Sequence, residues 1–223
     1  YVANNIFKLA DGDTEGWGSF IGAIFTKDCI IENNQFIRPA AGPFKGVILG
    51  VKQPGLIIRN NVFTNCGIGG GFLTNINDGN PIIEDNTFNY TSYYGGWQMS
   101  LIEGGNTSNI VRDLIFRNNI INVDFPTAAS NTQFRGIIGT RDGWNGVTFI
   151  NNVITNNTVT YTGANKGSAY FIWIASNFDS SNSVTNNLAN GVTAAGAMRI
   201  DGVDQSFIAT GNVNELGQTL TKQ

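Results

Sequence analysis

The chain has 223 residues, a net charge of −3 and only 13% charged residues, with 28 glycines, 5 prolines and no histidine. This composition predicts a turn-rich β protein, because long solvated helices need more Glu, Lys and Arg. The negative charge argues against a nucleic-acid partner, and the lack of histidine excludes serine-triad and imidazole–zinc chemistry.

One motif recurs along the whole chain. It reads apolar-x-apolar-x-Asn-Asn-x-apolar, and its second Asn returns at steps of 25 to 35 residues. Apolar residues alternate with outward positions on each side of the Asn pair, and β-branched residues dominate, so two short strands should meet at each pair. The copies span residues 3–7, 29–36, 56–63, 81–88, 114–121, 147–154, 182–189 and 207–214, with second Asn positions at Asn5, Asn34, Asn61, Asn86, Asn119, Asn152, Asn187 and Asn212.

The Asn pair predicts a sharp corner in the chain. Asn is the non-glycine residue that most readily takes the left-handed conformation such a corner requires. Stacked coils about 4.8 Å apart would place each Asn above the last, where the side-chain amides form a ladder. Asp85 and Gly211 replace the first Asn in two copies. A further Asn pair, in the segment 155–159, is either a loop or another corner.

This repeat resembles the coils of right-handed parallel β-helices in the pectin-lyase-like superfamily, and the resemblance covers essentially the whole chain. It implies an all-β fold in which residues 1–223 form one right-handed parallel β-helix of about eight coils, with an Asn ladder at one corner. Because the chain opens inside a coil, we expect a fragment or a processed part of a longer protein. The resemblance also implies a third strand before each motif, in the segments 20–25, 46–51, 71–76, 97–103, 134–140, 170–176 and 197–202.

Two patterns occupy the outward positions beside the corner. Glu32, Arg59, Glu84 and Arg117 alternate in sign, which indicates a ladder of surface ion pairs. The second pattern is an apolar strip, which monomers rarely leave in water. Three copies around a common axis would bury it, as in phage tailspikes, so we expect a homotrimer or another stable oligomer. The strip comprises Ile30, Ile57, Ile82, Ile115, Val62, Ile120, Val153, Leu188 and Val213.

The C-terminal end of the chain shows neither the helix nor the polar repeat that normally caps a solenoid. This open end is a second reason to expect an oligomer. The alternative is a monomer in which residues 215–223, or a flanking domain outside this sequence, fold back over the apolar strip.

Variable insertions before the third strands should wall a groove on one side of the solenoid, and function in repeat proteins tends to lie on such a face. The insertions and their strands are rich in aromatic and charged residues. Rings stack on the apolar faces of pyranoses while fixed polar groups orient the hydroxyls, which suits a polysaccharide or a cell-surface glycan. The candidate binding residues are Trp97, Arg135, Arg141, Trp144, Tyr170, Trp173 and Arg199.

Enzymes of this superfamily cut polysaccharides on the equivalent face, by hydrolysis with paired carboxylates or by β-elimination. The resemblance therefore makes Glu103, Asp142 and Asp201 candidate catalytic residues of a hydrolase or lyase, since hydrolysis needs two carboxyls about 5 to 10 Å apart. Such an enzyme would work without histidine. The sequence shows no dense Asp cluster and no metal-ligand spacing, so we expect neither a metal nor a cofactor.

Three functions compete at this point. The first is polysaccharide recognition, with or without depolymerase activity, and the second is a structural or adhesive solenoid of a fibre or surface protein. The third is ice binding, which needs flat rows of outward Thr where this sequence offers Ile and mixed charge. The resemblance implies an extracellular, cell-surface or virion location. No apolar run approaches the roughly 18 residues of a membrane span, so we expect no membrane insertion.

Overall fold

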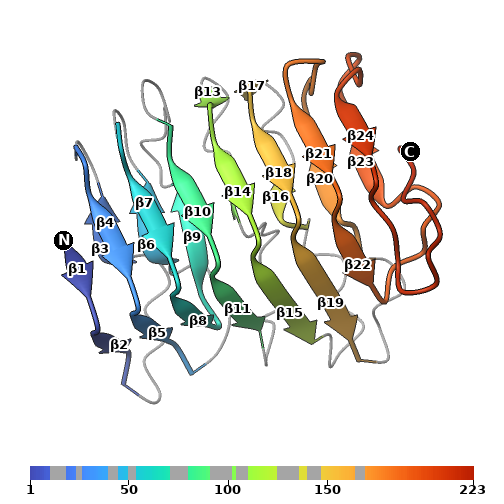
Figure 1. Ribbon diagram of the computed structural model, residues 1–223. Coiled ribbons are helices and arrows are strands. Elements are labelled where there is room, and N and C mark those ends of the chain that lie inside the picture. The colour runs from blue at the N-terminus through green and yellow to red at the C-terminus, as the bar shows by residue number, and fades with distance from the viewer. Residues whose placement is uncertain are drawn as a thin grey trace.

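The computed structural model describes residues 1–10, 19–23, 27–39, 45–49, 54–70, 80–90, 102–103, 110–124, 136–139, 147–163 and 169–223. Their strands stack along one axis, and the two termini lie at opposite ends of the stack (Figure 1). The named strands pair only in parallel. The fold is the expected right-handed parallel β-helix. Within the described part of the chain there is no helix, and therefore none that could cross a membrane.

Sheet A is the most regular wall of the solenoid, because seven of its eight strands have three residues and a left-handed corner residue follows each strand. Each isoleucine of one strand pairs with the equivalent residue of the next, as Ile58 does with Ile31 and Ile83. The eight strands in spatial order are β1 (Val2–Ala3), β4 (Ile30–Glu32), β7 (Ile57–Arg59), β10 (Ile82–Glu84), β14 (Ile115–Arg117), β18 (Val153–Thr155), β21 (Ser183–Thr185) and β24 (Ile208–Thr210).

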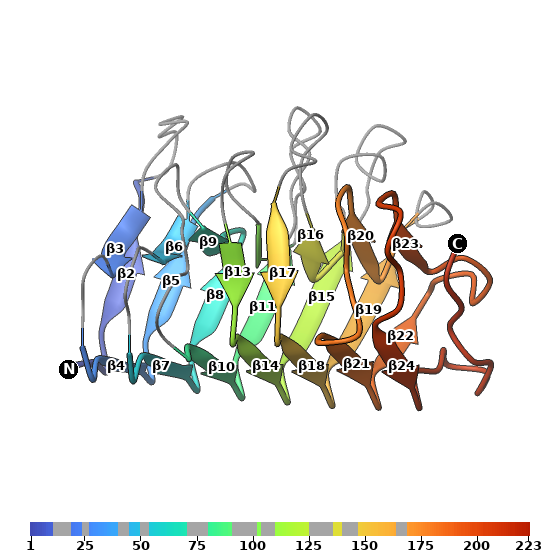
Figure 2. The ribbon, with the colours of Figure 1, turned by 90° about the horizontal axis from the view of Figure 1, so that it is seen from above.

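Sheet B begins directly after the Asn corner in each coil, and sheet C closes the coil (Figure 2). Sheet B contains β2 (Ile6–Lys8), β5 (Gln35–Ile37), β8 (Val62–Thr64), β11 (Thr87–Tyr90), β15 (Ile120–Asp124), β19 (Thr158–Thr162) and β22 (Leu188–Asn190). Sheet C contains β3 (Ser19–Ala23), β6 (Lys45–Leu49), β9 (Gly67–Gly70), β12 (Ile102–Glu103), β16 (Ile138–Gly139), β20 (Ile172–Ile174) and β23 (Met198–Ile200). A short sheet D pairs β13 (Ile110–Arg112) with β17 (Thr148–Ile150).

The third strands of the coils lie where the sequence predicts them, with one exception. The expected strand at 71–76 falls outside the described residues, and the sheet C strand of that coil is β9, which starts earlier at Gly67. β9 follows Asn65, which has a left-handed φ of 55°. A second corner soon after β8 therefore turns this coil into sheet C without a long connection.

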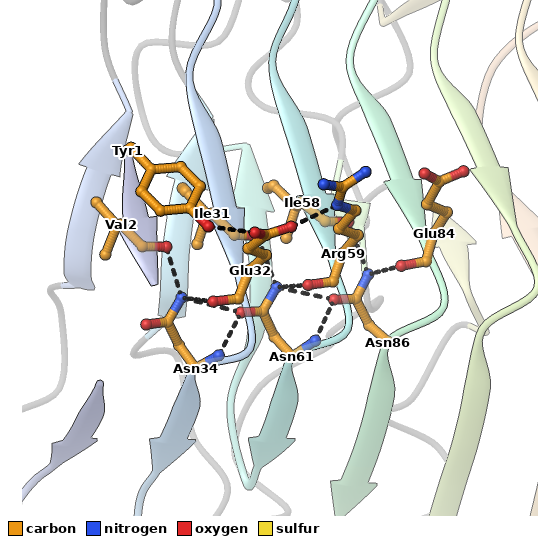
Figure 3. A network of polar contacts seen from close by, with 10 residues as sticks. All are labelled: Tyr1, Val2, Ile31, Glu32, Asn34, Ile58, Arg59, Asn61, Glu84 and Asn86. Atoms are coloured by element: carbon orange, nitrogen blue, oxygen red, sulfur yellow. Dashed lines mark hydrogen bonds and ion pairs between the residues drawn. The ribbon is translucent and has the colours of Figure 1, made fainter. Parts of the chain in front are cut away.

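The two residues of each Asn pair have different tasks, which corrects the expectation that one residue both bends the chain and forms the ladder. The first residue carries the left-handed backbone, with φ of 57° at Asn118 and 69° at Gly211. The second carries the ladder: Asn86 donates from its backbone N–H (3.0 Å) and from Nδ2 (3.1 Å) to Oδ1 of Asn119. Figure 3 shows the same contacts along Asn34, Asn61 and Asn86.

The ladder does not pass through Asn152. Asn119 instead donates to Oδ1 of Asn157 (2.9 Å from its backbone N–H), so the segment 155–159 is the main corner of its coil. Asn152 belongs to a second, shorter ladder one corner earlier, where its Nδ2 donates to Oδ1 of Asn182 at 2.8 Å. Two Asn pairs five residues apart carry the same local pattern, and only the stacking on the preceding coil decides which of them joins the main ladder.

The inward rows fill the interior of the solenoid, as expected. Phe36, Phe63 and Phe88 form a stack with ring centroids 4.8 and 4.7 Å apart and interplanar angles of 12° and 9°. All three side chains are fully buried. Such a packed row is core, because offset-stacked rings at this spacing leave no room for a ligand between coils.

The outward rows of sheet A combine ion pairs with an apolar strip. Arg59 Nε binds Glu32 Oε2 and Arg117 Nη2 binds Glu84 Oε2, each at 2.6 Å, so the alternating row divides into two ion pairs. Toward the C-terminus the same row continues as Thr155, Thr185 and Thr210, which the sequence analysis overlooked. The isoleucine row beside it, Ile30, Ile57, Ile82 and Ile115, is in register and half-buried.

Residues 214–223 cap the C-terminal end of the solenoid, so the expectation of an open end is wrong. Leu220 is buried, and its N–H donates to the carbonyl of Asn212 at 2.9 Å. Lys222 Nζ donates to the carbonyls of Gln205 (2.7 Å) and Phe207 (3.0 Å). The tail thus covers the apolar interior of the last coil and satisfies carbonyl groups at its edge.

Candidate functional site

The outward face of sheet C carries an aromatic and charged cluster near the C-terminal end. In β20 the inward neighbours Ile172 and Ile174 are buried, so the alternation of the strand directs Trp173 outward. Arg199 of β23 lies beside Trp173 in parallel register. Cross-strand neighbours on one face of a sheet are about 5 Å apart, which brings the guanidinium and the indole into contact.

Four side chains form this cluster, which we call the Trp173 cluster: Tyr170, Trp173, Arg199 and Asp201. The guanidinium carbon of Arg199 lies 4.1 Å from the centroid of the Trp173 ring. Asp201 links both residues, because Arg199 Nε donates to its Oδ1 at 2.7 Å and Trp173 Nε1 donates to its Oδ2 at 2.9 Å. The Tyr170 ring is 4.9 Å from the Trp173 ring and tilted by 54°.

The charge of Arg199 is well supported in this cluster. Burial lowers the pKa of its guanidinium, but the hydrogen bonds to Asp201 and Tyr170 and the charge of Asp201 outweigh that effect and raise the pKa. The side chains of Arg199 and Asp201 keep 32% and 37% of their surface exposed. A cation on a ring face with an anchoring carboxylate is a rigid polar surface that solvent and ligands can reach.

A buried tyrosine fixes the edge of the cluster. Tyr161 of β19 is almost fully buried, and its hydroxyl donates to the backbone carbonyl of Tyr170 at 2.6 Å. Burial also raises the pKa of Tyr161, so the hydroxyl keeps the proton that this bond needs. The contact ties sheet B to the start of the segment that carries Tyr170 and Trp173.

A cavity of about 750 Å³ adjoins the cluster and shares Asp201 with it. It lies where the chain leaves sheet C, between the segments that follow β20 and β23 and the region of β17. Two further carboxylates, Asp179 and Asp204, line it together with Ser176 and Asn177. We call this the acidic cavity. Its remaining walls are formed by Val147, Thr148, Phe149, Ala175, Gly202 and Val203.

In the turns after sheet C, Asp179 and Asp204 each accept hydrogen bonds through one carboxylate oxygen, Oδ1. Oδ1 of Asp204 accepts hydrogen bonds from the N–H (3.0 Å) and hydroxyl (2.7 Å) of Ser206, and these bonds lower the pKa of Asp204. Oδ1 of Asp179 accepts from the N–H of Ser181 (3.0 Å) and from Asn182 Nδ2 (3.1 Å). Oδ2 of each carboxylate has no hydrogen bond to any described residue, so each can still accept one from a ligand.

Of the candidate residues named from the sequence, the structure brings together Tyr170, Trp173, Arg199 and Asp201. Glu103 ends β12, and through Gly139 its backbone is in register with Trp173 two coils away. The other candidates, Trp97, Arg135, Arg141, Asp142 and Trp144, lie outside the described residues.

A search of protein-family models, of curated proteins and of solved structures finds no match to this chain. The fold therefore rests on the geometry of the coils, and the function rests on the side chains of the site. The features that the chain shares with parallel β-helices are the stacked parallel sheets and the Asn ladder.

Sequence reasoning missed Asp179 and Asp204, although a signal was present. Each stands two residues before a serine, in the pattern Asp-x-Ser, and such an Asp commonly accepts a hydrogen bond from the backbone two residues on. The two patterns lie on neighbouring coils, since the N–H of Phe178 donates to the carbonyl of Asp204 at 2.9 Å. A repeat of short polar turns at stacked positions would have identified this corner.

Proposed function

We propose that the chain binds a polysaccharide on the outward face of sheet C, with the Trp173 cluster as the main contact. The observation that carries this proposal is the indole of Trp173, which contacts both Arg199 and Tyr170 and is anchored by Asp201. Aromatic rings provide apolar area for a pyranose, and the guanidinium has donors beyond those used by Asp201 for its hydroxyl groups. The acidic cavity extends this surface around the next corner.

We assign Asp201 to binding and not to proton transfer. Both of its oxygens accept hydrogen bonds, from Arg199 and from Trp173, and a general acid must give up its proton at the reacting atom. A carboxylate anchored in this way orients the indole and the guanidinium. The proposal is therefore recognition of the polysaccharide by this cluster.

The test is binding of a panel of neutral, acidic and basic oligosaccharides, measured by calorimetry on the wild type and on Trp173→Ala and Arg199→Ala. We expect at least one oligosaccharide to bind, and each variant to weaken it about tenfold or more, as for an anchor worth about 1 to 3 kcal/mol. Arg117→Ala is the matched control, because Arg117 forms an equally short ion pair on sheet A. Binding that is unchanged in Trp173→Ala and Arg199→Ala would refute the proposal.

The second candidate is a structural solenoid that assembles with copies of itself. It is favoured by the isoleucine row of sheet A, which is in register from Ile30 to Ile115, and by the exposed side chain of Ile120 (49% exposed). Self-association would cover this apolar area. Light scattering at micromolar concentration tests it: a mass near 24.0 kDa that does not change in Ile57→Lys/Ile82→Lys excludes assembly through this row.

A further inference from the structure

We propose that the acidic cavity takes a saccharide unit bearing a protonated amine, and that it rejects units bearing carboxylate, sulfate or phosphate groups. This inference rests on the proposed polysaccharide binding and names the class of sugar. It begins from charge. Three carboxylates line the cavity, and Asp201 is neutralised by Arg199, which leaves the charges of Asp179 and Asp204.

No positively charged side chain lines the cavity among the described residues. Hydrogen bonds from Ser206 are the main cause of the lowered pKa of Asp204, and the charge of Lys222 contributes less to it. The Lys222 ammonium is itself bound to the carbonyls of Gln205 and Phe207. Among the described residues the lining of the cavity therefore carries a net negative charge, which favours a cationic ligand.

The carboxylates do not form a metal site. Within the described part of the chain no three acidic, cysteine or histidine residues come together in a group that could hold a metal ion. The free Oδ2 atoms of Asp179 and Asp204 therefore suit a ligand that brings its own hydrogen-bond donors. An ammonium group has three such donors and a compensating charge.

Ser176 gives independent evidence for a ligand in this wall. The residue is only 4% exposed, and its hydroxyl has no hydrogen-bond partner among the described residues. A buried hydroxyl without a partner is destabilising, and because Ser176 lines the cavity, we infer that a polar group of the ligand is its partner. Asn177 adds an amide group, whose Oδ1 accepts the N–H of Asp204 at 3.1 Å. A hydroxylated ring satisfies these groups, whereas a simple alkyl amine does not.

The experiment is a titration of amide resonances at about pH 6 and low salt, followed at Asn177, Gly202 and Asp204. The probes are glucosamine, N-acetylglucosamine, glucuronate and ethylamine. We expect saturable shifts with glucosamine, binding at least about fivefold weaker with N-acetylglucosamine and with ethylamine, and no shifts with glucuronate. In Asp179→Asn/Asp204→Asn the affinity for glucosamine should fall about tenfold, because two attractive charges are lost.

Asparagine keeps an Oδ1 for the bonds to Ser181 and Ser206, so these turns can persist, and the spectrum itself reports whether the variant is folded. Asp124→Asn is the matched control, because Asp124 accepts a hydrogen bond from Thr162 on sheet B at 3.2 Å and is remote from the cavity lining. Equal binding of glucuronate, or an unchanged glucosamine affinity in the double variant, overturns the inference. If ethylamine binds as tightly as glucosamine, the cavity recognises an ammonium group alone, and the inference that its ligand is a sugar is overturned.

The two proposals fail in different ways. The cavity is probed with monosaccharides at its own amides, whereas the polysaccharide proposal is decided by oligosaccharide binding that depends on Trp173. If glucosamine shifts the cavity amides but Trp173→Ala leaves oligosaccharide binding unchanged, only the polysaccharide proposal is refuted. If Trp173→Ala weakens oligosaccharide binding but glucosamine causes no shifts, only the inference about the amine is refuted.

Discussion

Replacing Asn119 by leucine is the most direct test of how the corner stabilises the fold. Asn119 is fully buried, and its side chain makes five hydrogen bonds. Oδ1 accepts two from Asn86, and Nδ2 donates to the carbonyls of Ile83 and Arg117 and to Oδ1 of Asn157. Leucine has a similar size but can make none of these bonds, and it leaves the buried N–H of Asn86 without a partner.

The expected loss follows from these contacts. Five hydrogen bonds at about 1 kcal/mol each are offset by roughly 1 kcal/mol from burial of the added apolar surface, so Asn119→Leu should destabilise by roughly 4 kcal/mol. For a chain of this length each kcal/mol shifts Tm by about 2 to 4 °C, which predicts a fall of roughly 10 °C. Asn118→Leu should lose only about 1 kcal/mol, because it affects the left-handed residue (φ 57°) and no ladder bond.

Asn118→Gly is the control for backbone conformation, since Gly211 already occupies the equivalent position of another coil with φ 69°. Thermal melting by circular dichroism, together with urea titration to check that the slope is unchanged, measures all three variants. The division of tasks between the two Asn residues would be refuted if Asn119→Leu melted like the wild type. It would also be refuted if Asn118→Leu were the more destabilising of the two.

Two further predictions concern the stability of the C-terminal cap and the dependence of the Tm on pH in the acid range. Leu220→Asp should lower stability by about 2 to 4 kcal/mol because it places a charge in the buried cap, whereas Leu216→Asp, at a position 75% exposed, should not change the Tm. Hydrogen bonds from Tyr1 and Arg59 lower the pKa of Glu32 below its ordinary 4.5, and bonds from Ser206 lower that of Asp204 below 3.8. A carboxyl with a lowered folded-state pKa stabilises the fold above its ordinary pKa and loses that contribution as the pH falls. The Tm should therefore decline below about pH 4.5, and a Tm curve of Glu32→Gln/Asp204→Asn as steep as that of the wild type would contradict this assignment.

The sequence predicted the repeat and the core because both depend on local pattern. Rows such as Phe36, Phe63 and Phe88 alternate with outward residues at a period of two, and this period alone fixes which side faces the interior. The main corner at Asn157 could not be separated from Asn152 in this way. Both lie in an Asn pair followed by a β-branched residue. The coil stacked before them decides which of the two joins the main ladder.

The candidate site was predicted only where register follows from the repeat. Trp173 and Arg199 lie at equivalent points of neighbouring third strands, so the spacing of the motifs places them side by side. The acidic cavity depends instead on how the chain turns after sheet C. Asp179 and Asp204 share the Asp-x-Ser pattern, which marks the two turns, but that pattern does not specify the shape of the space between them.

The contrast between inward and outward rows also explains why the candidate site lies near one end. Inward positions must fit the residue above and below, and this requirement holds the same residue type over several coils. The column of sheet C that contains Trp173 and Arg199 does not have to meet this packing requirement, and its residue type changes at nearly every coil. Two large residues, Trp173 and Arg199, follow one another in this column on the last two strands of sheet C, beside the turns that carry the acidic cavity. A ligand that needs both an aromatic surface and carboxylates finds them together there. By backbone register, the positions equivalent to Trp173 and Arg199 on the other strands are Gly22, Ile48, Gly69, Glu103 and Gly139.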